Sequence, residues 1–312
     1  MGLLSQVRDH LLASGKRSRT AGSYCTWLRK FYSWRKAPAG EWKPEDLREF
    51  LYVMSREGYS AISRKQAFFA IRYAFINILK AEEEDFEDFP LPGVRKSQRD
   101  CPSLREVAAI LSHMRGRPLL QAKLMYGCGL RISAVCRLRV KDIDFENRQV
   151  VVRDAKGGKD RLTILPSDLD DDLLAHLALR KAEHRCDLAE GRGRAPMPGR
   201  LGAKYPGYGL KFGWQWVFQS EKVHGDTRWH TTPRHLQEHF ARAVEAAGIH
   251  KRLVPHSLRH GFATHLQMAG VPPREIQKLL GHTHLETTEL YTHAMLAPRD
   301  IPSPLSLLCT VG

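Results

Sequence analysis

The chain has 312 residues, enough for two domains, because a single hydrophobic core stops growing at roughly 250 to 300 residues. No apolar run approaches the roughly 20 residues that span a bilayer, which excludes a membrane-embedded protein. The net charge of +15 favours a polyanionic partner, nucleic acid first, over a basic protein that is merely soluble.

The apolar stretch at the N-terminus is interrupted by charged residues, which is not the layout of a secretory signal. We therefore expect a cytoplasmic protein. The six cysteines are scattered and form no C-x-x-C pair, which indicates reduced structural thiols rather than a zinc or redox centre.

Periodic apolar residues predict helices through about the first 80 residues. One apolar face, which we interpret as core, comprises Tyr24, Trp27, Leu28, Phe31 and Tyr32. The basic residues interspersed with such faces suit DNA phosphates better than the aromatics suit base stacking. Our candidate phosphate contacts are Lys16, Arg17, Arg19, Lys65 and Arg72.

A change in composition marks a domain boundary. The acidic stretch AEEEDFEDF is followed by PLPGVRKSQRDCP, which has three prolines and the opposite charge, and we assign residues 89–102 to a linker. Ser103 and Glu106 then form an S-x-x-E capping box ahead of an apolar run. These features predict domains at residues 1–88 and 103–312.

The second domain begins with helical patterns and then changes period. Runs from Gln149 and from Arg161, with Gly157 and Gly158 between them, predict a β-hairpin that has Lys156 near its tip. Helical spacing returns at 168–190. Residues 191–220 form an irregular insertion, and a loop that long inside a domain is usually functional or disordered.

Several polar motifs of this domain are weak when taken singly. Gly129 is predicted to close one helix and Arg131 to open the next, where its guanidinium would add donors to a backbone suited to anions. His256 and Arg259 lie three apart on a predicted helix, so both can contact one anion. A solvated side chain is the commoner role for an isolated Arg131 or Lys156.

Together the motifs resemble the tyrosine recombinase (phage integrase) family. The resemblance consists of G-L-R-I-S around Arg131, Lys156 on a hairpin, H-x-L-R-H at residues 256–260, Gly-His ending at His282, and Tyr291 nine positions on. The order and spacing cover the whole second domain, and the family's helical DNA-clamping domain matches the first. The implied fold is mostly helical α+β, with an N-terminal all-α SAM-like core-binding domain and a mixed α/β catalytic domain.

The resemblance implies six catalytic positions: the nucleophile Tyr291, the phosphate clamp Arg131 and Arg259, the general acid Lys156, and His256 and His282 in support of the transition state. Two guanidiniums can stabilise the charge that develops at phosphorus without a metal. A free tyrosine hydroxyl has a pKa near 10 and is about 4 kcal/mol short of full ionisation at neutral pH, a deficit that nearby cations lower. A phosphotyrosine conserves the bond energy, so strands are exchanged rather than hydrolysed.

Two further histidines, His284 and His293, match no catalytic position of the family. We interpret them as facing solvent or DNA. A zinc site at His282, His284 and His293 would need a supporting ligand pattern such as H-E-x-x-H, which the sequence lacks. We expect no metal and no cofactor.

Within the tyrosine recombinase family, the insertion resembles a segment of one subfamily, the integron integrases. Their K-Y-P and W-x-W-x-F-x-S elements correspond to Lys204-Tyr205-Pro206 and to residues 214–220, and S-P-L at residues 303–305 resembles their tail. That subfamily binds folded single-stranded cassette sites (attC) through displaced bases, and a double-stranded attI site. Generic Xer or phage recombinases do not usually carry such a segment between the hairpin and the H-x-x-R helix.

Exposed aromatics suit displaced bases, since stacking one base is worth roughly 1 to 3 kcal/mol. Our DNA-contact candidates here are Lys204, Tyr205, Trp214, Trp216, Trp229 and His230. Alternation along a strand would place Trp214 and Trp216 on one face and Val217 on the other, so core packing of one face is an equal alternative. Trp229-His230 also departs from the paired histidines that are common in the subfamily.

We therefore predict a bacterial, nucleoid-associated integron integrase with no small-molecule substrate. A homotetramer on DNA, linked by exchange of C-terminal tails such as Pro304-Leu-Ser-Leu-Leu, follows from the resemblance. The alternatives are a Xer- or phage-like recombinase that acts on duplex sites and a DNA-binding protein without catalytic activity.

Overall fold

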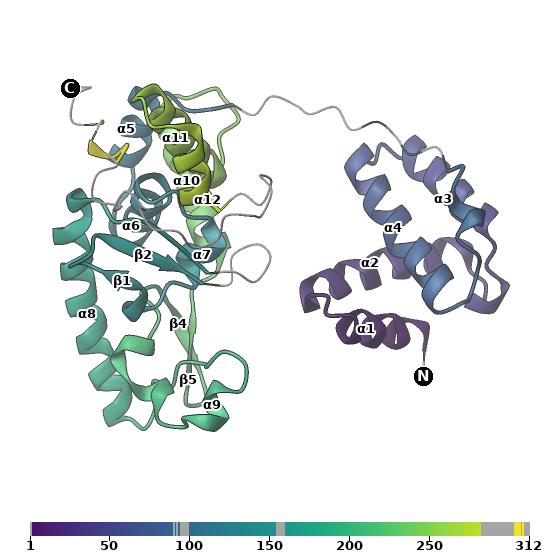
Figure 1. Ribbon diagram of the computed structural model, residues 1–312, viewed down its shortest axis with the longest axis horizontal. Helices are drawn as coiled ribbons and strands as arrows, with labels where there is room; N and C mark the ends of the chain where they lie inside the picture. Colours follow the sequence, from purple (N-terminus) through teal and green to yellow (C-terminus); the bar gives the residue numbers. More distant parts are fainter. Residues whose placement is uncertain are drawn as a thin grey trace. The chain divides into compact units, whose positions relative to one another are not determined.

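The computed structural model describes residues 2–89, 91, 93, 100–153, 160–281, 303–306 and 308. The chain divides into two compact units, Met1–Gln98 and Arg99–Gly312. Helices dominate both units, and the second also contains two small antiparallel sheets (Figure 1). This is the mostly helical α+β organisation that the sequence predicts.

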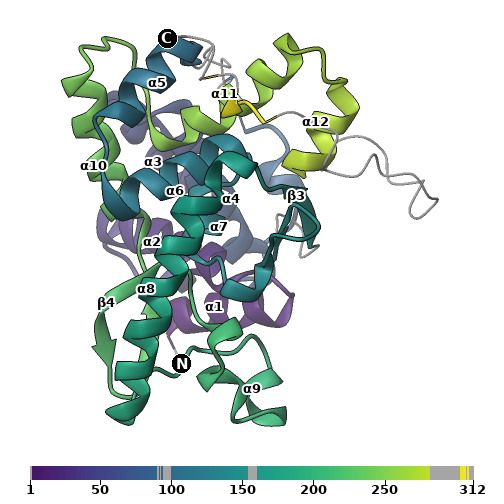
Figure 2. The ribbon, with the colours of Figure 1, turned by 90° about the vertical axis from the view of Figure 1, so that its left-hand side faces the viewer.

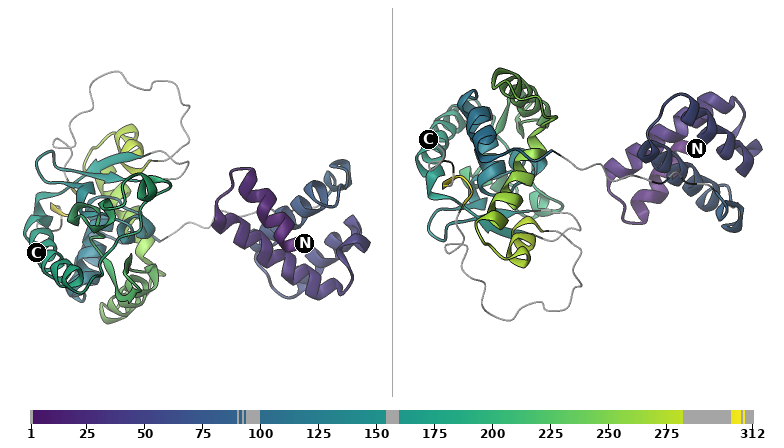
Figure 3. Two further views of the ribbon diagram at one scale, coloured as in Figure 1. Left: turned by 90° about the horizontal axis from the view of Figure 1, so that it is seen from below. Right: turned by 90° about the horizontal axis from the view of Figure 1, so that it is seen from above.

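Four helices form the first unit: α1 (Leu3–Ala13), α2 (Ser18–Arg35), α3 (Pro44–Arg56) and α4 (Ala61–Asn77). The helices pack on one another (Figure 3), and many of the side chains buried between them are aromatic. Phe31 is one of these, with its ring centroid 4.8 Å from that of Trp42 and 5.3 Å from that of Phe50, both edge-on. Such edge-to-face pairs are stabilising beyond the area that they bury.

The predicted apolar face of α2 is buried at its centre and open at its edge. Leu28 and Phe31 are fully buried, and Tyr24 and Trp27 are half-buried. Tyr32, in contrast, is 55% exposed, although its ring contacts that of Trp42. Residue 32 lies at the margin of the stripe on a helix of 3.6 residues per turn, so it falls outside the core.

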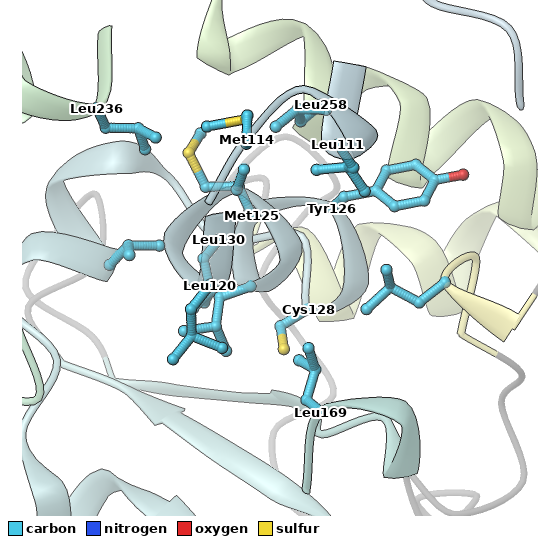
Figure 4. Close-up of a cluster of buried hydrophobic side chains, with 14 of the residues drawn as sticks. Leu111, Met114, Leu120, Met125, Tyr126, Cys128, Leu130, Leu169, Leu236 and Leu258 are labelled. Carbon is cyan, nitrogen blue, oxygen red and sulfur yellow. The ribbon is translucent and has the colours of Figure 1, made fainter. Parts of the chain in front are cut away.

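The second unit contains these helices in its described residues: α5 (Leu104–Ser112), α6 (Gly116–Gly127), α7 (Ile132–Cys136), α8 (Asp170–Ala189), α9 (Leu201–Lys204), α10 (Pro233–Ala246), α11 (Pro255–Met268) and α12 (Pro273–Leu280). The helix α5 begins with the predicted capping box, in which the backbone N–H of Ser103 donates to the Glu106 carboxylate. The helix α6 lies at the centre of the unit and packs against α10 and α11. Figure 4 shows Met125 of α6 with Leu111, Leu236 and Leu258 from the surrounding helices.

Two antiparallel sheets flank this helical core. The first has the order β1-β2-β3, from β1 (Ile143–Asp144), β2 (Gln149–Val152) and β3 (Arg161–Ile164). The pairing of β2 with β3, from Gln149 opposite Ile164 to Val152 opposite Arg161, is the predicted hairpin. Residues 154–159 of the connection between the two strands, Lys156 among them, lie outside the described part of the chain.

The second sheet pairs β4 (Gln219–His224) with β5 (Thr227–His230) and follows the insertion. Together with α9 it forms the end of the unit opposite α5 and α11, and the long helix α8 runs alongside (Figure 1 and Figure 2). Buried side chains hold the insertion in place through hydrogen bonds to its backbone carbonyls. The Gln215 amide donates to the carbonyls of Gly193 and Gly209, at 3.0 and 2.7 Å, and His184 contacts the Leu210 carbonyl at 2.9 Å.

A buried ion pair joins the second sheet to α8. Arg228 of β5 donates through Nε and Nη2 to both carboxylate oxygens of Asp187, and through Nη1 to the carbonyls of Ser220 and Glu221. Asp187 is 5% exposed and Arg228 is 9% exposed. A bidentate pair of this kind fixes orientation as well as distance, so it sets how β4 and β5 lie against α8.

The described tail residues pack on the helical core of their own chain. The Leu305 side chain fills the space beside Gly127 and Pro166, and the Ser306 hydroxyl donates to the Asp168 carboxylate at 2.9 Å. Leu308 contacts the same core. Within the described residues, no helix is long and apolar enough to cross a membrane.

The Asp187–Arg228 pair yields a stability prediction. Asp187→Ala leaves a buried guanidinium without its carboxylate, and we expect the free energy of unfolding to fall by about 3 kcal/mol in urea denaturation. Asp226→Ala is the matched control, since the Asp226–Arg194 pair is exposed and its loss should leave the unfolding midpoint nearly unchanged. Equal effects of the two substitutions would contradict a structural role for the buried pair.

Candidate active site

Arg259 of α11 is the best-defined member of the predicted clamp. Its side chain is buried, with the residue only 3% exposed. Nη2 donates to the Leu280 carbonyl at 2.6 Å, and Nη1 donates to the Gly129 carbonyl. These two carbonyls belong to the end of α12 and to the connection between α6 and α7, so the guanidinium is held by two segments far apart in the sequence.

Gly129 explains how the Arg131 side of the site is formed. Its φ of +61° lies in the left-handed region, as the sequence predicts for a residue that closes a helix. An added Cβ would lie 2.7 Å from two ring atoms of Phe262. The chain therefore turns tightly against α11 and places Arg131 as the N-cap of α7. The carbonyl of Gly129 accepts a hydrogen bond from Arg259.

Positive charges gather around this turn. Burial lowers the pKa of Arg259 well below its ordinary value, and the charges of Arg131 and Arg161 lower it further. Burial likewise lowers the pKa of Arg161 to about 10, with a further contribution from Arg131. Three guanidiniums that repel one another form a site whose repulsion a bound oxyanion would offset.

His256 lies one helical turn before Arg259 on α11, and it is partly exposed. Its ring centroid is 4.9 Å from that of His260. The structure thus brings Arg131, Arg259 and His256 to one region of the unit. The other three predicted catalytic residues, Lys156, His282 and Tyr291, lie outside the described residues, as do His284 and His293.

The sequence interpretation missed one member of the cluster, Arg161. It is the first residue of β3, and its Nη1 donates to the Leu279 carbonyl at the end of α12. Its position five residues after Lys156, on the returning strand of the hairpin, was the available signal. Periodicity does not show that this strand end faces α12.

The structure corrects the role proposed for Trp216. The ring is only 6% exposed, its Nε1 donates to the Arg228 carbonyl at 3.1 Å, and the Arg139 guanidinium lies 3.8 Å from its ring centroid. The expected strand alternation is also wrong, because residues 212–214 form a 3₁₀ turn and Trp216, Val217 and Phe218 are all buried. Core packing therefore accounts for Trp216.

Trp214 is half-buried and enclosed by cations. The Lys141 ammonium lies 3.1 Å from the centroid of the Trp214 ring, and the Arg139 guanidinium lies 5.5 Å from the same centroid. Arg139 is itself buried, and it donates to the Trp214 and Pro196 carbonyls. The Trp214 ring therefore makes cation–π contacts with side chains of its own chain.

The other insertion candidates are accessible. Tyr205 is 37% exposed and stacks on Tyr208, with centroids 4.7 Å apart, and Lys204 is also exposed. Trp229 is 46% exposed. His230 is partly exposed, and its ring packs edge-on against Trp216.

The basic candidates of the first unit are also at its surface. Lys16, Arg17 and Arg19 are exposed around the connection between α1 and α2. Lys65 and Arg72 on α4 are partly exposed, and Arg72 lies 3.7 Å from the Glu83 carboxylate.

Comparison with known proteins agrees with this architecture. Residues 103–297 match the phage integrase family, and residues 3–85 match the phage integrase N-terminal SAM-like domain. An integrase/recombinase of Escherichia coli is 35% identical, over 98% of this chain and 94% of the relative. The tyrosine recombinase XerA of Thermococcus onnurineus is 31% identical, over 93% of this chain and 90% of the relative.

Two solved structures share the fold. The Tn1549 transposon integrase in complex with circular intermediate DNA has a TM-score of 0.63 and 21% identity, over 96% of this chain and 98% of that one. A lambda integrase dimer bound to a COC′ core site has a TM-score of 0.62 and 16% identity, over 94% and 98%.

A SAM-like helical domain followed by this catalytic fold defines the tyrosine recombinases, enzymes that cleave and rejoin DNA strands. The chain belongs to the phage integrase family of these enzymes.

Gly129 provides a test of how the site is built. In Gly129→Ala, the left-handed backbone alone costs about 1 to 2 kcal/mol, and the methyl group would displace the Phe262 ring or the carbonyl that binds Arg259. We expect both the unfolding midpoint in urea and the rate of DNA cleavage to fall.

Gly248→Ala is the matched control, because Gly248 also has a positive φ of +65° but has open space around it. Gly248→Ala should lower the unfolding midpoint through the strained backbone alone and should leave the rate of DNA cleavage unchanged. If Gly129→Ala cleaves DNA as fast as Gly248→Ala, the position of the Gly129 carbonyl does not determine how Arg259 acts in cleavage.

Proposed function

We propose that this recombinase is an integron integrase, which excises and integrates gene cassettes at folded single-stranded attC sites and a double-stranded attI site. The observation that carries the proposal is the insertion between the hairpin and α11. It is a packed extension of the unit that presents cations and aromatic rings at its surface, a combination suited to single-stranded nucleic acid.

The proposed contact surface has two parts. Lys204 and Tyr205 are exposed on and after α9, where Lys204 lies 5.3 Å from the Tyr205 ring and Lys211 lies 4.1 Å from the Tyr208 ring. Trp229 is exposed on β5. We assign base stacking to Trp229 and Tyr205, with Lys204 on the backbone, because an exposed ring can receive a displaced base.

We propose that the chemistry follows the six catalytic positions. The Tyr291 oxygen forms a bond to the scissile phosphorus while the bond to the 5′-oxygen breaks, and Lys156 donates the proton that makes this oxygen a hydroxyl. Arg131 and Arg259 hold the phosphate and stabilise the added charge. His256 and His282 support the transition state, and one of them accepts the tyrosine proton.

We propose that the partner of this site is DNA, which would also contact the basic residues of the first unit. We propose that the exposed Lys16, Arg17 and Arg19 contact DNA phosphates, together with the partly exposed Lys65 and Arg72 on α4. We further propose a homotetramer in which the site beside Gly127 and Pro166, occupied by Leu305 of the same chain, accepts the tail of a neighbour, since identical tails fit identical sites. Such an enzyme would act in the bacterial cytoplasm, beside the nucleoid.

A Xer-like recombinase that acts on duplex sites is the second candidate. The similarity to the XerA relative over 93% of the chain favours it. The two functions share the catalytic centre and differ in the form of DNA that the insertion must bind.

The nucleophile is tested with a nicked suicide substrate. Wild-type enzyme should accumulate a covalent protein–DNA adduct, because the released fragment cannot be rejoined. Tyr291→Phe lacks the attacking oxygen and should form no adduct while it still binds DNA. An adduct formed by Tyr291→Phe, resolved on a denaturing gel, would assign the attack to another residue.

The form of the substrate is tested by comparing the folded bottom strand of a cassette site with the same sequence as a duplex. We expect recombination of the folded strand to be at least about tenfold faster, since stacking one displaced base is worth roughly 1 to 3 kcal/mol. Trp229→Ala should weaken binding of the folded strand and leave binding of the duplex unchanged.

Leu179→Ala serves as a surface control, because Leu179 is 67% exposed on α8 and is not among the proposed DNA-contact residues. Equal recombination of both DNA forms by the wild type would favour the Xer-like candidate. An equal effect of Trp229→Ala on both forms would remove the tryptophan from base recognition.

A further inference from the structure

The end of α12 is a junction between the hairpin and the phosphate clamp. Arg161 of β3 donates from Nη1 to the Leu279 carbonyl, and Arg259 of α11 donates from Nη2 to the Leu280 carbonyl at 2.6 Å. These carbonyls are consecutive and lie at the negative end of the helix, where cations bind favourably. One helix end thus fixes two guanidiniums relative to each other.

The glycine that ends α12 brings the chain tightly around Arg161. Gly281 is the C-cap in the left-handed conformation, with φ of 62°. A Cβ added there would lie 2.4 Å from Cδ and 2.9 Å from Nε of Arg161. The side chain of Arg161 is therefore packed directly against the residue that precedes His282.

The strand β3 is held at a second point by a hydroxyl. The Thr163 hydroxyl donates to the Cys128 carbonyl at 2.8 Å, one residue before Gly129. Ile164, the next residue of the strand, is buried in a small apolar cluster with Phe262 of α11 and Leu280 of α12. The strand is thus joined to the same two segments that hold Arg259.

A buried cation at position 161 costs folding stability, so packing alone is a poor reason for an arginine there. Nε and Nη2 of Arg161 are buried and have no hydrogen-bond partner among the described residues. The nearby charges of Arg131 and Arg259 also repel it. An apolar side chain of similar volume is often as stable or more stable at such a site, so packing alone does not explain an arginine here.

We propose that Arg161 is a positioning residue that sets the register between the hairpin carrying Lys156 and the phosphate clamp of Arg131 and Arg259. The inference rests on the proposed role of Lys156 as general acid. Lys156 lies five residues before Arg161, so fixing the start of β3 limits where the lysine can reach. Proton transfer requires the donor within hydrogen-bond distance of the leaving 5′-oxygen.

The experiment compares two suicide substrates that differ in one atom. In the second substrate, sulfur replaces the bridging 5′-oxygen at the scissile phosphate. A thiol has a pKa near 8.5, so the departing thiolate needs no proton and a misplaced general acid no longer limits the rate. Single-turnover cleavage is measured for wild type, Lys156→Ala, Arg161→Gln and Arg153→Gln.

With the oxygen substrate, we expect Arg161→Gln to cleave roughly 100-fold more slowly than wild type, the size of effect that misplacement by about 1 Å produces. With the sulfur substrate, it should come within about threefold of wild type, as should Lys156→Ala, because the proton is no longer needed. Arg161→Lys, which keeps a cation at the helix end, should regain part of the rate with the oxygen substrate.

Arg153→Gln is the matched control on the same hairpin. Arg153 donates to Asp142 at 2.6 Å and to Asp160 at 3.2 Å, and these bonds do not involve α12. This substitution should leave cleavage of both substrates near the wild-type rate. Thermal melting and binding of uncleaved DNA show whether each variant is folded, and Arg161→Lys replaces Arg161→Gln if the latter is not.

The outcomes separate this inference from the proposed function. An equal loss on both substrates by the Arg161 variant, with Lys156→Ala rescued by sulfur, would overturn the positioning role and leave the general acid intact. Lack of rescue for Lys156→Ala would overturn the general acid itself, and the positioning role with it.

Discussion

The catalytic unit depends on the placement of one buried guanidinium. Arg259 is held by the carbonyls of Gly129 and Leu280, which come from segments about 150 residues apart in the chain. Charge-assisted hydrogen bonds of this kind are roughly twice as strong as neutral ones, and burial sharpens their directional demand. The turn before α7, the helix α11 and the end of α12 must all be correctly packed before the arginine can bind anything.

The positive charges of Arg131, Arg161 and Arg259 lie close enough to repel one another. Together with burial, this repulsion lowers the pKa values of Arg161 and Arg259. The cost is offset by the surrounding apolar packing, in which Phe262, Leu266, Leu279 and Leu280 form a small cluster with Ile164 of β3. A site that stays positive without its ligand is suited to a phosphodiester, whose charge completes it.

The insertion achieves order by different means from the core. It is rich in glycine and proline and its helices are short, so backbone N–H groups supply only some of the hydrogen bonds that its carbonyls accept. Buried polar side chains supply others: Gln215, Arg139 and His184 each donate to or contact its carbonyls. Tyr205 of the insertion and Trp229 of β5 are left exposed at the surface.

Local patterns in the sequence determined much of this protein. They predicted the Ser103 capping box, the hairpin strands at Gln149 and Arg161, the left-handed Gly129 and the helix of His256, because each depends on neighbours within a few residues. They also supplied the ordered motifs that resemble the phage integrase family. Only the tertiary structure decided that Trp216 is buried under Arg139, and that Arg161 and Arg259 meet at the end of α12. Arg139 and Trp216 are 77 positions apart and Arg161 and Leu279 are 118 apart, and even the 21 positions from Arg259 to Leu280 span two helices. The geometry of these contacts is set by packing that no local period encodes.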